Sequence, residues 1–412
     1  MEEKRLSTVA KSLTPSPIQE LSHLAQRSNA VNLAEGFPDF PAPEHIKSAA
    51  VAAINSDFNQ YRHVQGICDL VADMVKLTQN LTIDPSKDVA ICCGQTEAFA
   101  AAVFAVVDRG DEVILFDPVY ETYETSISLA GGVPVFVPLD PPNWSLDADK
   151  LAKAVTTQTK AIVLNSPHNP TGKVFSKHEL EAIANVCRTR DILAITDEVC
   201  CVYSHQVYEH ITFDGEKHIS LASLPEMQTR TIITSSLSKT FSVTGWRVGW
   251  AISTPAIASA IRNIHIKLTD SAPAPFQEAA LTALKCSSEY FVSLRRDYES
   301  RRDFVVKLLS RVGFHVAVQP LGSFFVFAEM PQLCPLSDVE FVKELIKQAG
   351  VVAVPGCGFF HKGSSGDGGT DHRYQSRYIR FAFCKSVKTL TEAALRIGNL
   401  VDASGSLRLF QP

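Results

Sequence analysis

One lysine of this 412-residue chain stands in the run Ser235-Ser236-Leu237-Ser238-Lys239-Thr240-Phe241-Ser242-Val243-Thr244-Gly245-Trp246-Arg247-Val248-Gly249-Trp250. Small hydroxyl residues and glycines flank Lys239, and Arg247 follows eight residues later. A solvated surface lysine does not need such neighbours, whereas a lysine that forms an imine must be neutral part of the time. Such a lysine is held close to other positive charge or away from water.

Ser236 and Arg247 suit a phosphate group, because a hydroxyl can donate one hydrogen bond and a guanidinium two in a fork. Together with Lys239 they indicate pyridoxal 5'-phosphate, bound as a Schiff base on the lysine with its phosphate nearby. The alternative is a Ser/Thr-rich loop that leads into a buried strand at 248–252. Ser-x-x-Lys is a short pattern, so the rest of the chain has to separate these two readings.

Composition is that of a globular protein with a large core. Hydrophobic residues make up 45% and charged residues 20%, with a formal net charge of −5. The length predicts two domains, and the charge gives no reason to expect nucleic acid or a membrane as partner. The polar start, residues 1–5, has no apolar stretch behind it, and no apolar run approaches transmembrane length. We therefore expect a cytoplasmic protein.

The ten cysteines include two adjacent pairs, Cys92-Cys93 and Cys200-Cys201, but no Cys-x-x-Cys. They lie within apolar runs. This usage predicts reduced cysteines in the core, and neither disulfides nor a metal site.

Strand-like apolar runs alternate with helical stretches over residues 44–287, which we expect to form a large cofactor-binding domain. The strand-like runs are 89–93, 112–116, 133–137, 161–164, 193–196, 231–234 and 248–252. Helical stretches separate most of them, at 97–107, 121–129, 147–154, 177–187 and 255–266. This α/β pattern predicts a mostly parallel seven-stranded sheet flanked by helices, with ligands beyond the carboxyl ends of the strands.

Two further parts complete the predicted organisation. Residues 1–43, with a helix at 17–26, form an N-terminal arm and part of the small domain, and residues 288–412 form the rest of a small α+β domain. A long amphipathic helix at 289–311 opens that domain, and we interpret its arginines as a solvated face: Arg295, Arg296, Arg301 and Arg302. Strands at 314–318, 323–328 and 378–383 and helices at 338–348 and 387–401 follow.

Polar groups follow several of the predicted strands. Gly94-Gln95-Thr96 comes after the first strand, and a glycine turn that opens a helix presents N–H groups to a phosphate. The alternative is an ordinary junction with Thr96 as N-cap. Tyr120 follows the second strand, either to stack on a pyridine ring or as an ordinary core tyrosine. Gly36, in the arm, permits close approach of a ligand to the backbone or is a plain turn.

Two more strand ends carry candidate groups. Asn169 lies in a Pro- and Gly-rich loop, 165–172, where it can donate to a phenolate oxygen or a carboxylate, and His168 is interpreted as structural. Asp197 ends the 193–196 run, and a buried carboxylate there needs a partner. A protonated pyridine nitrogen would be that partner and would make the ring withdraw electrons. The alternative is a helix-capping or ion-paired aspartate.

In this order along the chain, these motifs resemble those of the fold-type I, class I aminotransferases over nearly the whole length. The matching runs are 32–40, 60–61, 94–96, 165–172, 197–199, 236–249 and 379–383. Within that family the chain is most similar to the kynurenine aminotransferase, glutamine transaminase K and cysteine-conjugate β-lyase branch. That likeness rests on residues 32–40 and on Arg380-Phe381-x-Phe383-x-Lys385. The resemblance implies the aspartate aminotransferase-like fold of the pyridoxal phosphate-dependent transferases.

The resemblance also implies a role for each candidate around the cofactor ring. Lys239 forms the Schiff base and carries the proton between the substrate Cα and C4′ of the cofactor. Asp197 pairs with the pyridine nitrogen, Asn169 bonds the phenolate oxygen and Tyr120 stacks on the ring.

At the two ends of the site the resemblance implies further contacts. The phosphate is held by Gln95, Thr96, Ser236 and Arg247. Tyr61 reaches the phosphate of the neighbouring subunit, which makes the enzyme an obligate homodimer with shared active sites. Arg380 clamps the substrate α-carboxylate, helped by the Gly36 backbone and Asn169.

Two positions depart from the family pattern. Cys200 stands where a tyrosine usually donates to the phenolate oxygen, and a thiol is a weak donor. We therefore expect the lysine imine to keep its proton to higher pH than is usual, unless Tyr203 substitutes. Asp270 stands where the branch offers aromatic or histidine side chains. Facing the pocket, it would favour a polar or cationic substrate; the alternative is a helix-boundary aspartate before Pro273.

The reaction implied is a ping-pong transamination between an L-amino acid and a 2-oxo acid. Expected donors are aromatic amino acids, methionine, glutamine or kynurenine, and expected acceptors are pyruvate, 2-oxoglutarate or phenylpyruvate. One alternative is β-elimination at the C–S bond of cysteine conjugates. The other is a binding scaffold without catalysis, against which Lys239, Asp197 and Arg380 argue.

Overall fold

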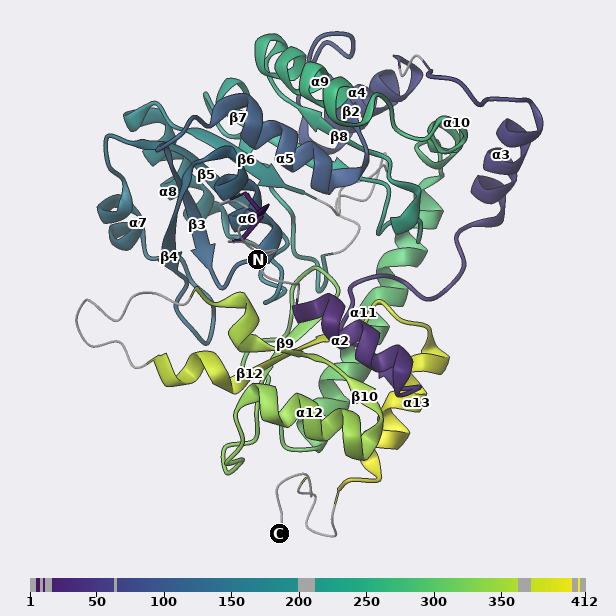
Figure 1. Ribbon diagram of the computed structural model, residues 1–412, viewed down its shortest axis with the longest axis vertical. Coiled ribbons are helices and arrows are strands. Elements are labelled where there is room, and N and C mark those ends of the chain that lie inside the picture. Colours follow the sequence, from purple (N-terminus) through teal and green to yellow (C-terminus); the bar gives the residue numbers. More distant parts are fainter. Residues whose placement is uncertain are drawn as a thin grey trace.

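The computed structural model describes residues 5–7, 10–11, 17–62, 65–198, 212–361, 372–401 and 407. Two lobes lie one above the other in Figure 1, with the long helix α11 (Ser288–Arg311) running from the upper, large lobe into the lower, small lobe. The division into lobes follows the expected order of parts, and the boundaries at 43/44 and 287/288 stay a prediction.

The large lobe is built on the predicted seven-stranded sheet. Its strands are β2 (Val89–Cys92), β3 (Glu112–Asp117), β4 (Val133–Pro138), β5 (Thr159–Asn165), β6 (Leu193–Asp197), β7 (Thr231–Ser236) and β8 (Gly249–Ile252). Their order in the sheet is β2-β8-β7-β6-β5-β3-β4. Only β8 runs antiparallel to its neighbours, β2 and β7, so the prediction of a mostly parallel sheet is confirmed.

Helices cover both faces of this sheet, which explains why most of its strands are continuous buried runs. Those expected from the sequence are α5 (Gly94–Val106), α6 (Glu121–Ala130), α7 (Ala148–Ala154), α8 (Lys177–Arg190) and α9 (Pro255–Thr269). The sequence analysis missed α3 (Glu44–Asn55), α4 (Gln65–Gln79) and α10 (Ala274–Ala283). Two of these, α3 and α10, bury mainly alanines, which mark a helical face weakly in the sequence.

The small lobe contains a three-stranded antiparallel sheet in the order β11 (Val354–Pro355), β12 (Tyr378–Ala382), β9 (Phe325–Glu329). The helices α2 (Pro17–Arg27), α12 (Asp338–Ala349) and α13 (Val387–Gly398) accompany it (Figure 1). The strand predicted at 314–318 is wrong. His315 makes a single antiparallel bridge with Glu329, and the chain then bends away at 317–318.

The N-terminal arm joins the small lobe through backbone pairing. Strand β1 (Val31–Asn32) runs parallel to β10 (Val351–Val352). Leu33 then accepts a hydrogen bond of 2.7 Å from Ala382 N, at the end of β12. The residues that follow, from Ala34 to Asp39, are therefore brought to the seam between the two lobes.

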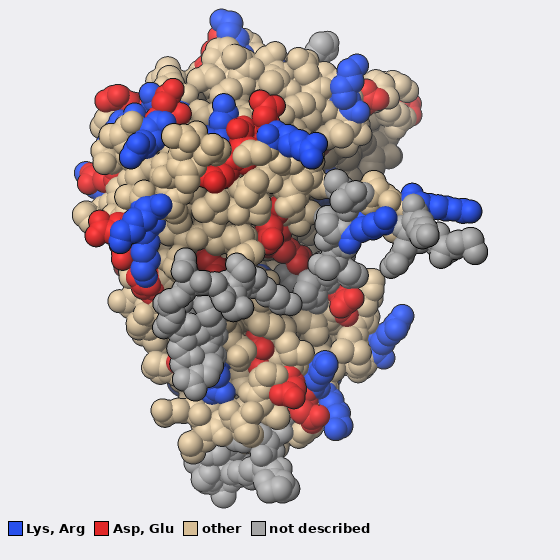
Figure 2. Space-filling view, turned by 60° about the vertical axis from the view of Figure 1, so that its left-hand side comes forward, with Lys and Arg blue, Asp and Glu red and all other residues tan. Residues whose placement is uncertain are grey.

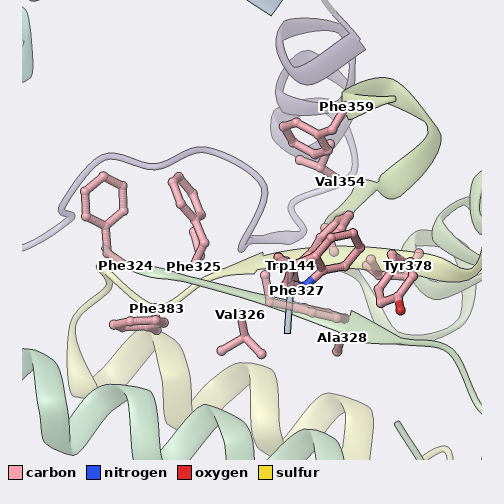
Figure 3. Packing of buried hydrophobic residues seen from close by; sticks show 14 of the residues in the cluster. Trp144, Phe324, Phe325, Val326, Phe327, Ala328, Val354, Phe359, Tyr378 and Phe383 are labelled. Atoms are coloured by element: carbon pink, nitrogen blue, oxygen red, sulfur yellow. The ribbon is translucent and has the colours of Figure 1, made fainter. Parts of the chain in front are cut away.

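Side chains of β9, and of Phe324 just before it, contribute to the core on both faces of the small sheet. Figure 3 shows Phe324 and Phe325 pointing to one face and Val326 to the other, toward the helices below. Trp144, from the large lobe, packs on this core with its ring centre 5.5 Å from that of Phe327. The two lobes therefore share one hydrophobic cluster.

One arginine of α11 corrects the sequence interpretation. Arg302 is only 1% exposed and belongs to the buried stripe of the helix, together with Tyr298, Val305 and Leu309. Its guanidinium makes two hydrogen bonds to Asp214, of 2.6 and 3.0 Å. A charged residue on the buried stripe of an amphipathic helix was misread as part of the solvated face.

The charged surface and the cysteines add little to the description of the fold. On the face shown in Figure 2, lysines and arginines lie intermixed with aspartates and glutamates. Among the described helices, none has both the length and the apolar character needed to span a bilayer. The eight described cysteines are free thiols, and burial raises the pKa of Cys187 to about 12 and that of Cys68 to about 11.

Candidate active site

A cavity of about 470 Å³ lies between the lobes at the carboxyl ends of the parallel strands. Ten of the predicted site residues line it: Gly36, Gln95, Thr96, Tyr120, Asn169, Asp197, Ser236, Lys239, Arg247 and Arg380. Of the residues to which the family resemblance gives a role, Tyr61 is the one that does not line the cavity of its own chain.

The register of the sheet explains why these groups converge. Asn165 ends β5 opposite Asp197 at the end of β6, and Asp197 in turn pairs with Thr234 of β7. Ser236 ends β7, and Lys239 follows in the turn beyond it. Neighbouring parallel strands place their last residues along one edge, so their side chains meet in one cavity.

Lys239 spans the gap between the lobes. Its Nζ donates a hydrogen bond to the backbone oxygen of Gly36, in the arm. The same ammonium lies 5.4 Å from the centre of the Phe324 ring, in the small lobe. The amine is therefore aimed into the cavity and is not directed to solvent on the outer surface.

Asp197 is 4% exposed, and its Oδ2 accepts a 2.5 Å hydrogen bond from the hydroxyl of Tyr123. Burial, and then the neighbouring carboxylate, raise the pKa of Tyr123 well above its ordinary value, so this tyrosine stays protonated and donates. The sequence analysis did not select Tyr123. The available signal was a tyrosine on the buried face of α6, because a buried tyrosine hydroxyl needs a partner.

The adjacent acid, Glu198, serves a different purpose. Its carboxylate accepts hydrogen bonds from Thr196, Ser220 and His218, at 2.8 to 3.1 Å. Burial would raise the pKa of Glu198, but these hydrogen bonds lower it on balance. Of the two neighbouring acids, Asp197 lines the cavity and Glu198 does not.

The first turn of α5 has a geometry that could hold an anion. The helix starts at Gly94, earlier than predicted, with Cys93 as N-cap, so the N-cap alternative for Thr96 is wrong. Gln95 and Thr96 lie in that first turn, where backbone N–H groups have no intrahelical acceptor. Gly94 has φ +80°, and a Cβ there would lie 2.5 Å from Arg247 Nη2. The glycine therefore lets the guanidinium lie directly on the helix start.

Glu97 braces this helix start and was not selected from the sequence as a site residue. It accepts hydrogen bonds from Cys93 N, from His265 Nδ1 at 2.8 Å and from the Thr269 hydroxyl at 2.7 Å. Burial would raise the pKa of Glu97, but these hydrogen bonds lower it on balance. Cys92 joins Glu97 and His265 in a group whose ligand-type atoms lie within 4.8 Å of one another.

Arg380, on β12, is 1% exposed and is therefore not a surface arginine. Its guanidinium donates to Asn169 Oδ1 at 2.8 Å and to Ala34 O at 2.7 Å. Among the described residues, no acceptor bonds its buried Nε. Burial lowers the pKa of Arg380 to about 10, which leaves it charged at neutral pH.

The loop that carries Asn169 is fixed from within. Asn165 Oδ1 accepts the Asn169 backbone N–H at 2.7 Å. His168 does not line the cavity; its Nδ1 lies 2.8 Å from the Thr171 hydroxyl, and burial lowers its pKa to about 3. This geometry agrees with a structural histidine.

Tyr61 lies apart from the cavity of its own chain. It is 76% exposed, and its hydroxyl lies 3.4 Å from Asp270 Oδ2. Asp270 follows α9 as its C-cap with φ +62° and does not line the cavity of this chain, in agreement with the helix-boundary alternative. Cys200 and Tyr203 are outside the described residues.

The donor set fits pyridoxal phosphate. A buried carboxylate suits a protonated ring nitrogen, and a helix start with an arginine lying on its glycine suits a phosphate dianion. The buried, unbonded Nε of Arg380 offers a donor to a substrate carboxylate. The cavity thus offers groups of complementary charge to the ring nitrogen and the phosphate of the cofactor and to the carboxylate of an amino acid.

Comparisons with known proteins agree with this geometry. Residues 28–397 match the model of the family described as aminotransferase class I and II. The chain is 36% identical to human kynurenine–oxoglutarate transaminase 1 over 408 residues, which cover 91% of this chain and 93% of that protein. It is 32% identical to the methionine aminotransferase of Escherichia coli over 384 residues, 92% of this chain and 95% of that protein.

Solved structures show the same architecture. The N-succinyldiaminopimelate aminotransferase of Mycobacterium tuberculosis matches with a TM-score of 0.87 and 35% identity, over 96% of this chain and 99% of that one. The aspartate aminotransferase of Thermus thermophilus matches with a TM-score of 0.84 and 28% identity, over the same shares of the two chains. The predicted aspartate aminotransferase-like fold is confirmed.

Proposed function

Since this chain belongs to the class I and II aminotransferase family and is an aminotransferase, we propose that it works at this cavity by a ping-pong mechanism. In such a reaction an L-amino acid would donate an amino group and a 2-oxo acid would accept it, and pyridoxal phosphate held by the residues of the cavity would supply the carrier between the two. The observation that carries this proposal is the convergence of Lys239, Asp197 and Arg380 on one cavity.

The cofactor of this family is pyridoxal 5'-phosphate, which when bound supplies an electron sink for the charge that develops at the substrate Cα. We assign Asp197 to the ring nitrogen, because Tyr123 fixes the carboxylate in orientation. Tyr120 packs on the ring, and Asn169 bonds the phenolate oxygen. These assignments rest on the shared cavity and on the family motifs.

We assign the phosphate to the first turn of α5 together with Gln95, Thr96, Ser236 and Arg247. The N–H groups of a helix start and its dipole favour an anion, and the guanidinium adds a full positive charge. Tyr61, exposed on its own chain, is assigned to the phosphate site of a second copy in a homodimer.

Lys239 moves the proton in this proposal. Its amine takes the proton from the substrate Cα and returns it at C4′ of the cofactor. Arg380 holds the substrate α-carboxylate, with Asn169 and the Gly36 backbone beside it, so that the Cα–H bond faces the lysine. Phe324 and Phe325 give the cavity an apolar wall on the side of the small lobe, which would limit the access of water to this transfer.

The proposed donors are aromatic amino acids, methionine, glutamine or kynurenine. The names of the relatives include kynurenine and methionine transaminases, which supports this range. The aromatic wall of the cavity, with Phe37, Tyr120, Phe324 and Phe325, supports the apolar and aromatic members of it.

A half-reaction assay tests the proposal. The holoenzyme is mixed with single L-amino acids and no 2-oxo acid, and the cofactor absorbance is followed. We expect the band to shift with the proposed donors and to recover when a 2-oxo acid is added. No shift with any L-amino acid would refute the proposal.

The matched variant is Lys239→Ala. We expect this variant to bind the cofactor. The rate of the absorbance shift should fall by about 10²–10⁴-fold, because the group that carries the proton is missing. An unchanged rate in this variant would assign the proton transfer to another group.

A further inference from the structure

Lys385 is a buried lysine that the proposed mechanism does not use. It is 1% exposed, follows β12 by three residues and does not line the cavity. Its Nζ donates to the backbone oxygen of Phe37 at 2.9 Å and lies 3.9 Å from the centre of the Phe37 ring. Among the described residues, no carboxylate forms an ion pair with it.

Such a placement is costly, because an ammonium loses its hydration on burial and here receives in return one hydrogen bond acceptor, one aromatic face and the charges of Asp39 and Glu35, which form no ion pair with it. Burial accordingly lowers the pKa of Lys385. Natural chains keep such an unfavourable arrangement mainly where function requires it.

The contact belongs to a series that fastens the arm to the small lobe. Ala34 O accepts from Arg380 Nη2 at 2.7 Å, and Asp39 accepts from Ser386 N. Between these two fastenings, Lys385 is the side chain that holds residue 37, directly after the Gly36 carbonyl that accepts from Lys239.

Phe37 is 36% exposed and lines the cavity, so without a fastening its ring would be free to move at the mouth of the site. We propose that Lys385 is a specificity-determining positioning residue, which fixes the Phe37 ring as a wall for an aromatic substrate side chain. This inference rests on the proposed function and names the substrate class that the site prefers.

The chemistry of the wall supports an aromatic substrate. Two other cations of the site also lie near phenylalanine rings: Lys239 at 5.4 Å from Phe324, and Arg380 at 4.1 Å from Phe325. A cation near one face of a ring draws electron density toward it and makes the rest of the ring less negative. Such a ring favours contact with an electron-rich aromatic side chain and disfavours a cationic one.

Binding of two unreactive acids to the holoenzyme tests the proposal. 3-Phenylpropionate carries a carboxylate and an aromatic ring, and propionate carries the carboxylate alone; both are measured by calorimetry. We expect Lys385→Met to raise the Kd of 3-phenylpropionate about tenfold and to leave that of propionate unchanged. An equal rise for both acids, or no rise for either, would overturn the proposal.

The variant Phe37→Leu tests the same proposal without changing the buried Lys385, so its result does not depend on how the fold tolerates loss of that lysine. We expect this variant to raise the Kd of 3-phenylpropionate by a similar factor. The double variant should have a Kd no higher than that of either single variant, because both substitutions act through the Phe37 ring. Additive losses would overturn the proposal. Lys388→Met, at an exposed position of α13, is the matched control and should change neither Kd.

The outcome is separable from that of the proposed function. If the wild-type holoenzyme transfers no amino group, the proposed function fails whatever the binding data show. If transfer occurs but kcat/KM for aromatic donors is unaffected by Lys385→Met, the inference fails alone. The expected result is a higher KM for aromatic donors, with kcat and the cofactor spectrum unchanged.

Discussion

At the scale of single residues, the site depends on side chains that hold the charged groups of the cavity in place. Tyr123 is the clearest case, since its hydroxyl fixes the carboxylate of Asp197. We expect Tyr123→Phe to raise the apparent Kd for pyridoxal phosphate about tenfold, because a hydrogen bond to a charged group contributes about 1.5–3 kcal/mol. Fluorescence or absorbance titration of the apoenzyme with the cofactor measures this.

Tyr298→Phe, in the buried stripe of α11, is the control for loss of a tyrosine hydroxyl from the core. It should leave the cofactor Kd within twofold of wild type, roughly the scatter among distant sites. If both variants bind the cofactor with the wild-type Kd, the hydrogen bond from Tyr123 to Asp197 does not contribute to cofactor binding.

Ten residues that line the cavity could be predicted from the sequence because they stand in short motifs, most of them at strand ends. Tyr123, Glu97 and Lys385 could not be selected in this way. Their importance lies in contacts with residues far away in the chain, such as His265 for Glu97 and Phe37 for Lys385. A sequence pattern shows how residues are spaced along the chain, but not which of them are in contact in the folded protein.

At the scale of elements, the start of α5 decides how tightly an anion is held. We expect Gly94→Ala to raise the cofactor Kd at least tenfold and to destabilise the fold by about 1–3 kcal/mol, since it adds both a strained φ and a collision with Arg247. Urea unfolding and cofactor titration measure the two effects.

Gly110→Ala is the matched control, because Gly110 has φ +92° but a Cβ there would meet nothing within 4 Å. This variant should be destabilised by the strained φ and should keep the wild-type affinity for the cofactor. If the two variants lose affinity for the cofactor equally, the close approach of Arg247 to Gly94 does not contribute to cofactor binding.

The loop at 165–172 gives a prediction about acid stability. The pKa of His168 falls from 6.5 to about 3 in the fold, so between these pH values the unfolded chain binds one more proton than the folded one. The free energy of unfolding should therefore fall as the pH drops below 6.5, by about 1.4 kcal/mol per pH unit from this residue alone. His168→Asn should show a shallower decline in urea unfolding between pH 6.5 and 4.5; equal slopes would exclude His168 as the cause.

Some boundaries of helices and strands could not be predicted from the sequence. The buried strands of the large sheet are continuous apolar runs and could be read directly, whereas the run at 314–318 looks like a strand and makes one bridge. β9 is the edge strand of its sheet, but the chain bends away from it at 317–318 after one bridge, which the local sequence does not show. The start of α5 was placed too late because a glycine, here with φ +80°, is typical of a turn and not of the first residue of a helix.

At the scale of the whole molecule, the account requires two copies. Tyr61 is exposed on its own chain, and we expect it to complete the site of a partner. Co-expression of Lys239→Ala with Tyr61→Ala should then restore roughly a quarter of wild-type activity, because half of the randomly assembled dimers contain one intact site of two. Each variant alone should be nearly inactive. If the mixture is no more active than the better single variant, Tyr61 serves its own chain or none.

The central claim is that the amine of Lys239 carries the cofactor, and one chemical measurement tests it most directly. The holoenzyme is reduced with borohydride, digested and mapped by mass spectrometry. We predict a single pyridoxyl group on the peptide that contains Lys239. A modification on another lysine, or none in a protein that transfers amino groups, would contradict the account.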